Sequence, residues 1–194
     1  MAIDQITLVN NGQKVERRYL LTVAEWTEDA KTNREVLGIR TEDSSIELNP
    51  DTETMTDIVG YTYTDVNKTE PQQDFDPYNL LGNSKLGAYL NDAFLTNNIT
   101  AYSNAFTVYI VELFLNPQTD FDNIQQRKYS NITDGFTAVM HANCSIIPTS
   151  IGGDSYISMP IEVHFSNKIT KGKVTFKDNE DMTDFAFTAT ADAG

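Results

Sequence analysis

The side chains with the clearest chemical potential are the two histidines and the only cysteine. His141 and Cys144 lie three residues apart in a stretch that alternates between apolar and polar residues, and His164 lies in another such stretch. A thiol next to an imidazole can act as a nucleophile with its base, and all three side chains can bind zinc. Residues three apart in a regular strand, however, point to opposite faces of a sheet, and no further ligand spacing completes a zinc site. The sequence therefore predicts neither a catalytic pair nor a metal site.

Carboxylates form a second group, and they gather between residues 42 and 77. This stretch has ten acids against one base, Lys68, which gives it a net charge of −9, whereas the whole chain carries −14. Asp51, Glu53 and Asp57 could begin a calcium loop, but the central glycine and the bidentate glutamate of such a loop are missing. We therefore interpret these carboxylates as a hydrated or inter-subunit face. They are Glu42, Asp43, Glu47, Asp51, Glu53, Asp57, Asp65, Glu70, Asp74 and Asp76.

Other chemical motifs are weaker. No phosphate-binding glycine loop and no serine-centred elbow is present, and Gly152-Gly153 is more simply a hairpin turn. One basic cluster could contact an anion, meet the acidic stretch of a neighbouring copy, or remain solvated. It comprises Lys168, Lys171, Lys173 and Lys177. We predict no enzymatic activity and no cofactor.

The acidic stretch itself is predicted to be a projecting hairpin. Two alternating segments, 45–49 and 55–63, flank the turn-forming residues 50–53, and a polar tail follows over residues 65–77. A hairpin this acidic would gain little from packing on its own core. We expect it to point outward, where its carboxylates stay hydrated and its strand edges can meet another chain.

The remaining chain is predicted to be rich in strands, with one helix. Ser84 can cap that helix, which runs over about residues 84–97 because Leu86 and Leu90 recur at helical spacing. A loop is expected over residues 27–33 and a turn at Lys171-Gly172. Strands are expected over residues 15–23, with Trp26 closing the first, and over 35–39, 106–115, 124–129, 136–146, 157–165, 174–176 and 185–189.

Length and composition limit the possible classes of protein. The 194 residues suffice for a single domain, and plentiful Thr, Val, Ile, Tyr and Phe favour a β-rich fold. The charge of −14 argues against tight binding to phosphate backbones. We expect no signal peptide, and the longest apolar run, residues 105–115, is too short to cross a membrane. A single cysteine rules out an intramolecular disulfide and fits a reducing cytoplasm.

The order of residues in the acidic stretch resembles the early part of major tail proteins of long-tailed, siphovirus-type bacteriophages. The similarity is carried by Asp43-Ser44-Ser45-Ile46-Glu47-Leu48-Asn49-Pro50-Asp51-x-Glu53, Thr56-Asp57-Ile58-x-Gly60, Glu70-Pro71 and Phe75-Asp76-Pro77. This resemblance implies a mainly β fold: one domain over residues 1–194, built as a two-sheet β-sandwich or barrel of the tail-tube type. It also implies one flanking helix and a long hairpin, about residues 42–77, that reaches neighbouring subunits.

The same resemblance implies a structural virion protein. Its copies would form hexameric rings that stack into the tail tube, through which DNA passes during ejection without specific binding. Other tail proteins, such as the tape measure, tail terminator and distal tail protein, would be its partners, and assembly would take place in the host bacterial cytoplasm. A tube protein of a secretion or bacteriocin-like contractile machine remains an alternative, as does a head-decoration or adhesin-like binding module.

The residues expected to contact other copies come from the hairpin and from the basic cluster. They are Glu47, Asp51, Glu53, Met55, Asp57, Tyr61, Tyr63, Lys171 and Lys173.

Overall fold

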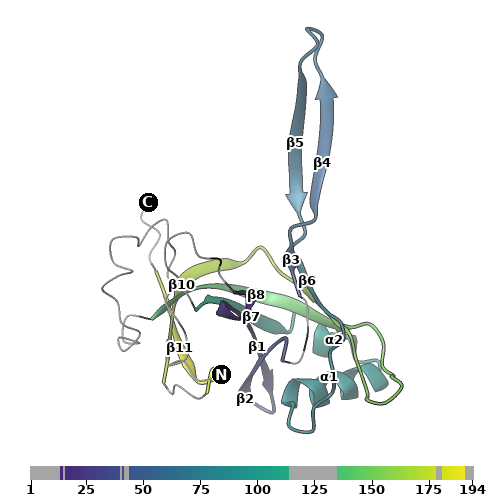
Figure 1. The fold of residues 1–194 in the computed structure, drawn as a ribbon, viewed down its shortest axis with the longest axis vertical. Helices are drawn as coiled ribbons and strands as arrows, with labels where there is room; N and C mark the ends of the chain where they lie inside the picture. The colour runs from purple at the N-terminus through teal and green to yellow at the C-terminus, as the bar shows by residue number, and fades with distance from the viewer. Residues whose placement is uncertain are drawn as a thin grey trace.

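The computed structural model describes residues 14, 16–39, 41, 44–113, 135–177 and 181–190 (Figure 1). It confirms the predicted mainly β fold with a flanking helix and a projecting hairpin. A 3-10 turn (Arg17–Tyr19) leads into β1, and two helices, α1 (Lys85–Leu95) and α2 (Ile99–Tyr102), lie in mid-chain. The strands are β1 (Leu20–Glu28), β2 (Lys31–Val36), β3 (Ile46–Glu47), β4 (Pro50–Thr56), β5 (Thr62–Thr69), β6 (Gln72–Phe75), β7 (Phe106–Glu112), β8 (Phe136–Pro148), β9 (Ile161–His164), β10 (Ile169–Phe176) and β11 (Phe185–Ala189).

One large antiparallel sheet forms the body. Its strands follow the order β2-β1-β7-β8-β9-β6-β3, and β10 pairs with both β8 and β11. The long strand β8 joins two parts of the sheet. Its first half pairs with β10, and its last four residues pair with β9. Within the described residues these strands do not close into a barrel.

Each face of the β1–β7 pair packs against its own hydrophobic core. Side chains alternate along a strand, so Val23 enters one core and its neighbour Ala24 enters the other. Val174 and Phe185, from β10 and β11, complete the first core. Strands β6 and β9 and helix α1 complete the second core, which contains Trp26, Phe75, Leu86, Leu90, Phe106, Ile146 and Ile161.

Helix α1 begins and ends close to the predicted positions. The Ser84 hydroxyl accepts a hydrogen bond from the Gly87 amide at 2.8 Å, and Asn97 ends the helix with a positive φ of 52°. Glu35 on β2 strengthens this cap, because its carboxylate accepts hydrogen bonds from the Ser84 hydroxyl at 2.5 Å and the Leu86 amide at 3.0 Å. A carboxylate at the positive end of a helix is favourable, so β2 fixes where α1 starts.

A bulge in β8 overturns one prediction. The pairing of β7 with β8 shifts between Phe106 and Val108, and Asn143 has a φ of 60°. As a result His141 and Cys144 are buried on the same face, and the thiol contacts the His141 carbonyl oxygen at 3.3 Å. The expectation of opposite faces was wrong because it assumed a regular strand. Burial raises the pKa of the Cys144 thiol, which disfavours the thiolate that a nucleophile requires.

Other local predictions were also wrong. Residues 27–33 form a tight hairpin between β1 and β2, because Asp29 and Ala30 both adopt positive φ angles of 47° and 60°. The strand expected over 157–165 is restricted to β9, and Ser158 instead makes isolated bridges to Asn79 and Gly152. The strand predicted over 124–129 lies outside the described residues.

Gly172 lies in the middle of β10 and does not form the predicted turn with Lys171. A β-carbon at this position would lie 2.5 Å from the Phe187 ring and 2.5 Å from the Thr188 carbonyl oxygen. The glycine therefore allows the aromatic ring of β11 to lie against the β10 backbone.

Replacing Gly172 with valine should push β11 away from β10. We expect Gly172→Val to lower the free energy of unfolding by about 1–3 kcal/mol, measured by urea denaturation. Gly82→Ala is the matched control, because nothing lies within 4 Å of the added β-carbon. Equal stability of Gly172→Val and the parent protein would contradict this account of the glycine.

Candidate functional site

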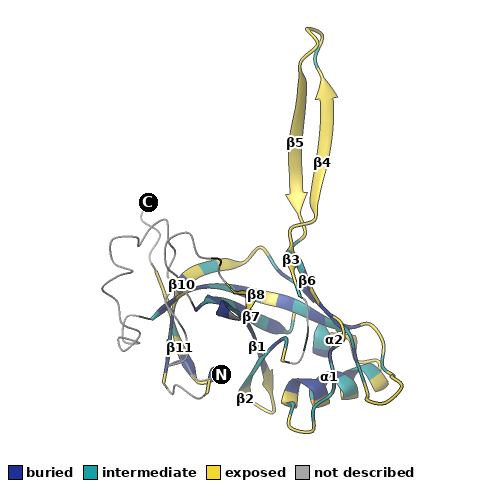
Figure 2. Cartoon of the chain, in the orientation of Figure 1, coloured by how far each residue is buried: buried dark blue, intermediate teal, exposed yellow. Residues whose placement is uncertain are grey.

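The projecting hairpin formed by β4 and β5 is the most unusual part of the chain. All seven residues of β4 and all eight of β5 are exposed, and the two strands form a separate sheet that stands away from the body (Figure 2). A soluble chain normally buries one face of each sheet. A hairpin with both faces in solvent therefore has no packing partner within the described part of the chain.

The boundaries of this hairpin differ from those predicted. The expected turn at residues 50–53 lies inside β4, and much of the expected polar tail forms β5 and β6. The true turn spans residues 57–61. The prediction failed because both faces of β4 and β5 are polar, so hydrophobic periodicity does not reveal these strands.

Asp57 organises the turn. Its carboxylate accepts hydrogen bonds from the amides of Val59 and Tyr61, both at 2.9 Å, and its backbone pairs with Tyr61 and Gly60. Gly60 supplies the positive φ of 90° that the turn requires. The hydrogen bond from the Tyr61 amide is the largest cause that holds the pKa of Asp57 below its usual range.

Protonation of Asp57 should loosen this tip. A carboxylate whose pKa is lower in the folded state stabilises that state above its unfolded pKa, and the stabilisation is lost as pH falls through the folded pKa. We expect the amide resonances of Val59 and Tyr61 to titrate together below about pH 4. Asp57→Ala should show the loosened tip at neutral pH. Asp57→Asn keeps an acceptor oxygen, and its amide resonances should not change at acid pH. If the Val59 and Tyr61 resonances of the parent protein do not change with pH, Asp57 does not organise the tip in this way.

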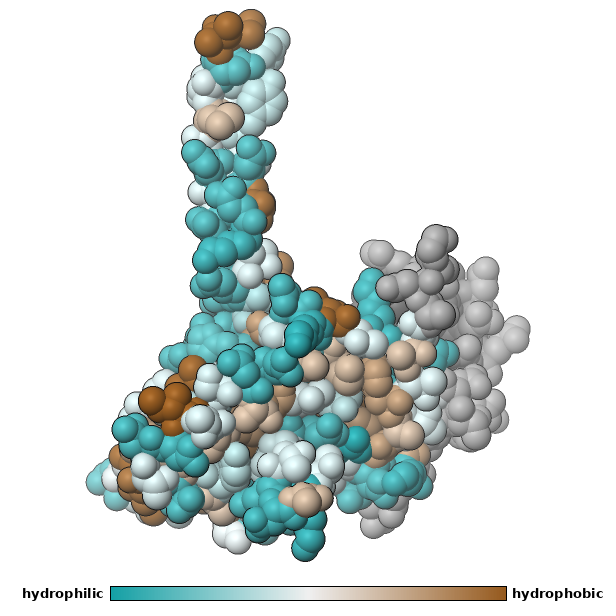
Figure 3. Space-filling model, turned by 180° about the vertical axis from the view of Figure 1, so that it is seen from behind, coloured by the Kyte–Doolittle hydropathy of each residue, from teal (hydrophilic) through white to brown (hydrophobic). Residues whose placement is uncertain are grey.

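The two faces of the hairpin have different chemistry. One face carries threonines 52, 54, 56, 62 and 64 together with Val66, and it has no charge. The opposite face pairs Glu53 with Asp65 and Met55 with Tyr63, and it also carries Asp51 opposite Lys68. The tip adds exposed apolar side chains, with Ile58 fully exposed and Val59 and Tyr61 at 73% and 65% exposure (Figure 3). The projection thus carries a charged face, an uncharged face and an apolar tip in separate places.

A narrow neck joins the hairpin to the body. The Glu70 amide donates to the Leu48 carbonyl oxygen at 3.0 Å, and the Asn49 side chain donates to the Glu70 carbonyl oxygen at 3.3 Å. Asn49 has a positive φ of 44°, which redirects the chain from β3 into β4. The neck separates the hairpin sheet from the short β3–β6 pair beneath it.

A buried amide fixes the base of this neck. Gln73 on β6 is fully buried, accepts a hydrogen bond from the Thr22 hydroxyl at 3.1 Å and donates to the Ser44 hydroxyl at 3.0 Å. Ser44 in turn donates to the Asp74 carbonyl oxygen at 2.8 Å. These hydrogen bonds join Ser44 and β6 to Thr22 through a buried amide, so the root of the projection is tied to β1.

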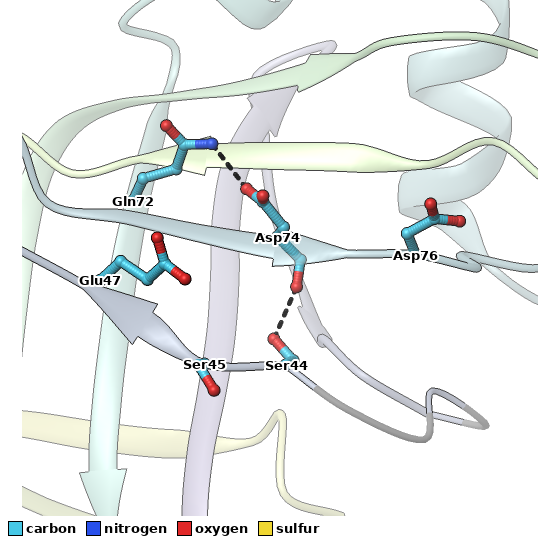
Figure 4. A pocket seen from close by; sticks show the side chains of 6 residues that line it. All are labelled: Ser44, Ser45, Glu47, Gln72, Asp74 and Asp76. Carbon is cyan, nitrogen blue, oxygen red and sulfur yellow. Dashed lines mark hydrogen bonds between the residues drawn. The ribbon is translucent and has the colours of Figure 1, made fainter. Parts of the chain in front are cut away.

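A shallow acidic hollow lies beside the same root (Figure 4). Asp74 accepts a hydrogen bond from the Gln72 side chain at 2.7 Å, and Glu47 and Asp76 lie on either side. Among the residues that the structure describes, no group of three or more His, Cys, Asp and Glu side chains is placed to hold a metal ion. The described helices also include none that is long and apolar enough to cross a membrane.

The predicted contact residues fall into three places. Asp51, Glu53, Met55 and Tyr63 share one face of the hairpin, Asp57 and Tyr61 form its tip, and Glu47 lies in β3 at the root. Lys171 and Lys173 lie apart from them, exposed on the outer face of β10. Their contacts with other copies stay predictions. The predicted contact residues did not include Asp65, Ile58 and Val59, which also lie on the hairpin. Ile58 and Val59 stand out in the sequence as an apolar pair within a polar stretch.

Comparisons with known proteins give limited similarity. No family model and no curated protein sequence matches the chain. Among solved structures, a sheath/tube terminator of the PVC extracellular contractile injection system matches at 13% identity and a TM-score of 0.43, covering 82% of this chain and 98% of that one. The PVC sheath–tube complex matches at 14% and 0.43, covering 84% and 95%.

A third solved structure, the tube-terminating cap of the anti-feeding prophage, matches at 11% identity and a TM-score of 0.44, covering 89% of this chain and 99% of that one. These three proteins are tube, sheath or cap components of their own assemblies. Similarity at this level does not establish a family for this chain, and the resemblance to major tail proteins stays a prediction.

Proposed function

We propose that this chain is a structural protein that assembles with copies of itself into stacked rings, which form the tube of a phage tail or of a related injection machine. The observation that carries the proposal is the hairpin of β4 and β5, which is exposed on both faces and along its whole length. Such a projection costs conformational entropy and buries nothing within the described chain. A role in contacts between copies accounts for both its length and its exposure.

The edges of the main sheet support the same proposal. Strands β2, β3 and β11 end the pairing of the described body, so each presents backbone groups on one side without a strand partner. Edge strands of adjacent copies can continue a sheet around a ring, which satisfies these groups. Six copies per ring is the number that the resemblance to major tail proteins implies, and a ring closes by the same heterologous contact repeated.

The charge of the chain suits a conduit for DNA. Each copy has a net charge of −14, so a lumen formed by many copies would repel phosphate backbones and let DNA slide. In this proposal the protein has no catalytic site or cofactor, and its partners are itself and other tail proteins such as the tape measure, tail terminator and distal tail protein. Reversing lumen-facing acids to lysine should slow DNA ejection, and unchanged infectivity would count against this step.

Electron microscopy of the purified protein at high concentration, with light scattering alongside, tests the proposal. Rings or tubes with a central channel are the expected result. A strict monomer at every concentration and salt tested would overturn it and favour a binding module. Copurification with a sheath protein would favour a contractile machine over a flexible tail.

A further inference from the structure

The outer face of β10 carries exposed lysines whose described cross-strand neighbours are all uncharged. Ile169, Lys171 and Lys173 are exposed, and they alternate with buried Gly172 and Val174. The cross-strand neighbours of the two lysines are Val139 and Thr137 on β8, and Thr188 on β11. None of these neighbours is acidic. Lys177, further along the chain, differs because it pairs with Asp184 at 2.6 Å.

The charged face of the hairpin has a net negative charge, because it carries Asp51, Glu53 and Asp65 against one base, Lys68. Asp51, Glu53 and Met55 follow one another at every second position of β4 and point to one side. Glu53 lies directly opposite Asp65, and like charges in this position destabilise a strand pair. A cation from outside the hairpin would remove that repulsion.

We infer that the outer face of β10 of one copy receives the charged face of the hairpin of a second copy, with the two strands antiparallel. This inference rests on the proposed function and specifies its contact. In this register Asp51, with Lys68 opposite it, meets Lys173, Glu53 with Asp65 meets Lys171, and Met55 with Tyr63 meets Ile169. Both rows repeat every two residues, about 6.8 Å, so all three contacts form together. A parallel arrangement would place Met55 and Tyr63 against Lys173, which leaves that lysine without an opposite charge in the contact.

The contact gives specificity more than strength. Exposed ion pairs contribute little each and are screened by salt, whereas like charges brought together are costly and reject wrong registers. The hairpin donor and the β10 receiver are different surfaces, so one copy can donate to a second and receive from a third. The uncharged threonine face of the hairpin takes no part in this contact.

A charge exchange tests the inference in the full chain. We expect Glu53→Lys alone and Lys171→Glu alone each to raise the concentration needed for assembly by about tenfold or more. An equimolar mixture of the two variants should assemble like the parent protein, because each variant's hairpin then meets an opposite charge on the other. Lys85→Glu, an exposed change of equal charge on α1, should leave assembly unchanged. Failure of the mixture to assemble better than its components would overturn the inference.

Cysteine cross-linking determines the direction of the contact. Asp51→Cys with Lys173→Cys should form disulfide-linked chains between copies under mild oxidation, whereas Asp51→Cys with Ile169→Cys should not. The reverse result would exclude the antiparallel register. If the parent protein forms rings but neither pair cross-links, this contact is wrong and the proposed function stands. If the parent protein never assembles, the proposed function itself fails.

Discussion

Removing the hairpin of β4 and β5 is expected to abolish assembly while leaving the body folded. All the residues of the two strands are exposed, so replacing residues 50–69 with a short Asn-Gly turn removes almost no buried apolar surface. Asn49 and Glu70 already lie within hydrogen-bonding distance of each other, so a short turn can bridge them. We expect the thermal unfolding midpoint to change by less than about 3 °C. Light scattering should show a monomer at concentrations where the parent protein is expected to form rings.

A smaller change separates the tip from the strands. Ile58→Ser with Val59→Ser keeps the charged face of the hairpin and removes two of the most exposed apolar side chains. An intermediate loss of assembly would show that the tip contributes to the contact in addition to the charged face. Rings formed by the protein that lacks residues 50–69 would contradict the central role of the hairpin.

Trp26→Ala is expected to have the largest effect on the stability of the body. Trp26 is 2% exposed, and its ring contacts both Tyr89 of α1 and Phe106 of β7, with centroids at 6.0 Å and 6.4 Å. Truncation leaves a cavity where the helix meets the sheet. We expect a loss of about 3–5 kcal/mol in the free energy of unfolding. Because this is the only tryptophan, circular dichroism in urea is the suitable probe.

Trp26→Phe is the informative control. The indole nitrogen of Trp26 is buried and makes no hydrogen bond within the described structure, so the parent protein already bears the cost of an unsatisfied donor. Phenylalanine removes that donor and keeps most of the aromatic contact. We expect Trp26→Phe to lose well under half of what Trp26→Ala loses. Similar losses for the two variants would show that the indole nitrogen has a partner.

The sequence predicts an element well where one physical signal dominates. Ser84 and the spacing of Leu86 and Leu90 located α1, and the apolar run that begins near Phe106 located β7. The prediction that a hairpin projects is also confirmed, because it depended on the density of acids rather than on periodicity. The predicted positions of its strands and turn were wrong, since threonines on one face and charged residues on the other leave no apolar period to follow.

Other features depend on contacts between distant segments. The bulge at Asn143 is visible only when β7 is paired with β8, and it decides that His141 and Cys144 share a face. Gly172 resembles a turn residue until Phe187, fifteen positions later, is found against it. Likewise, the alternation of Lys171 and Lys173 becomes informative only once β10 is known to have an exposed outer face.

The exposure of the hairpin on both faces also has a kinetic consequence. A two-stranded hairpin without a covering layer is only marginally stable in water, so we expect the projections of separate copies to open and re-form in solution. In the proposed assembly a neighbouring copy supplies the missing layer. The hairpins of the first few copies must then become ordered while few contacts exist to offset the entropy that ordering costs. Growth should therefore begin after a lag that shortens steeply with concentration. Preformed rings added as seeds should remove the lag, so that in a cell a template fixes where and when elongation starts.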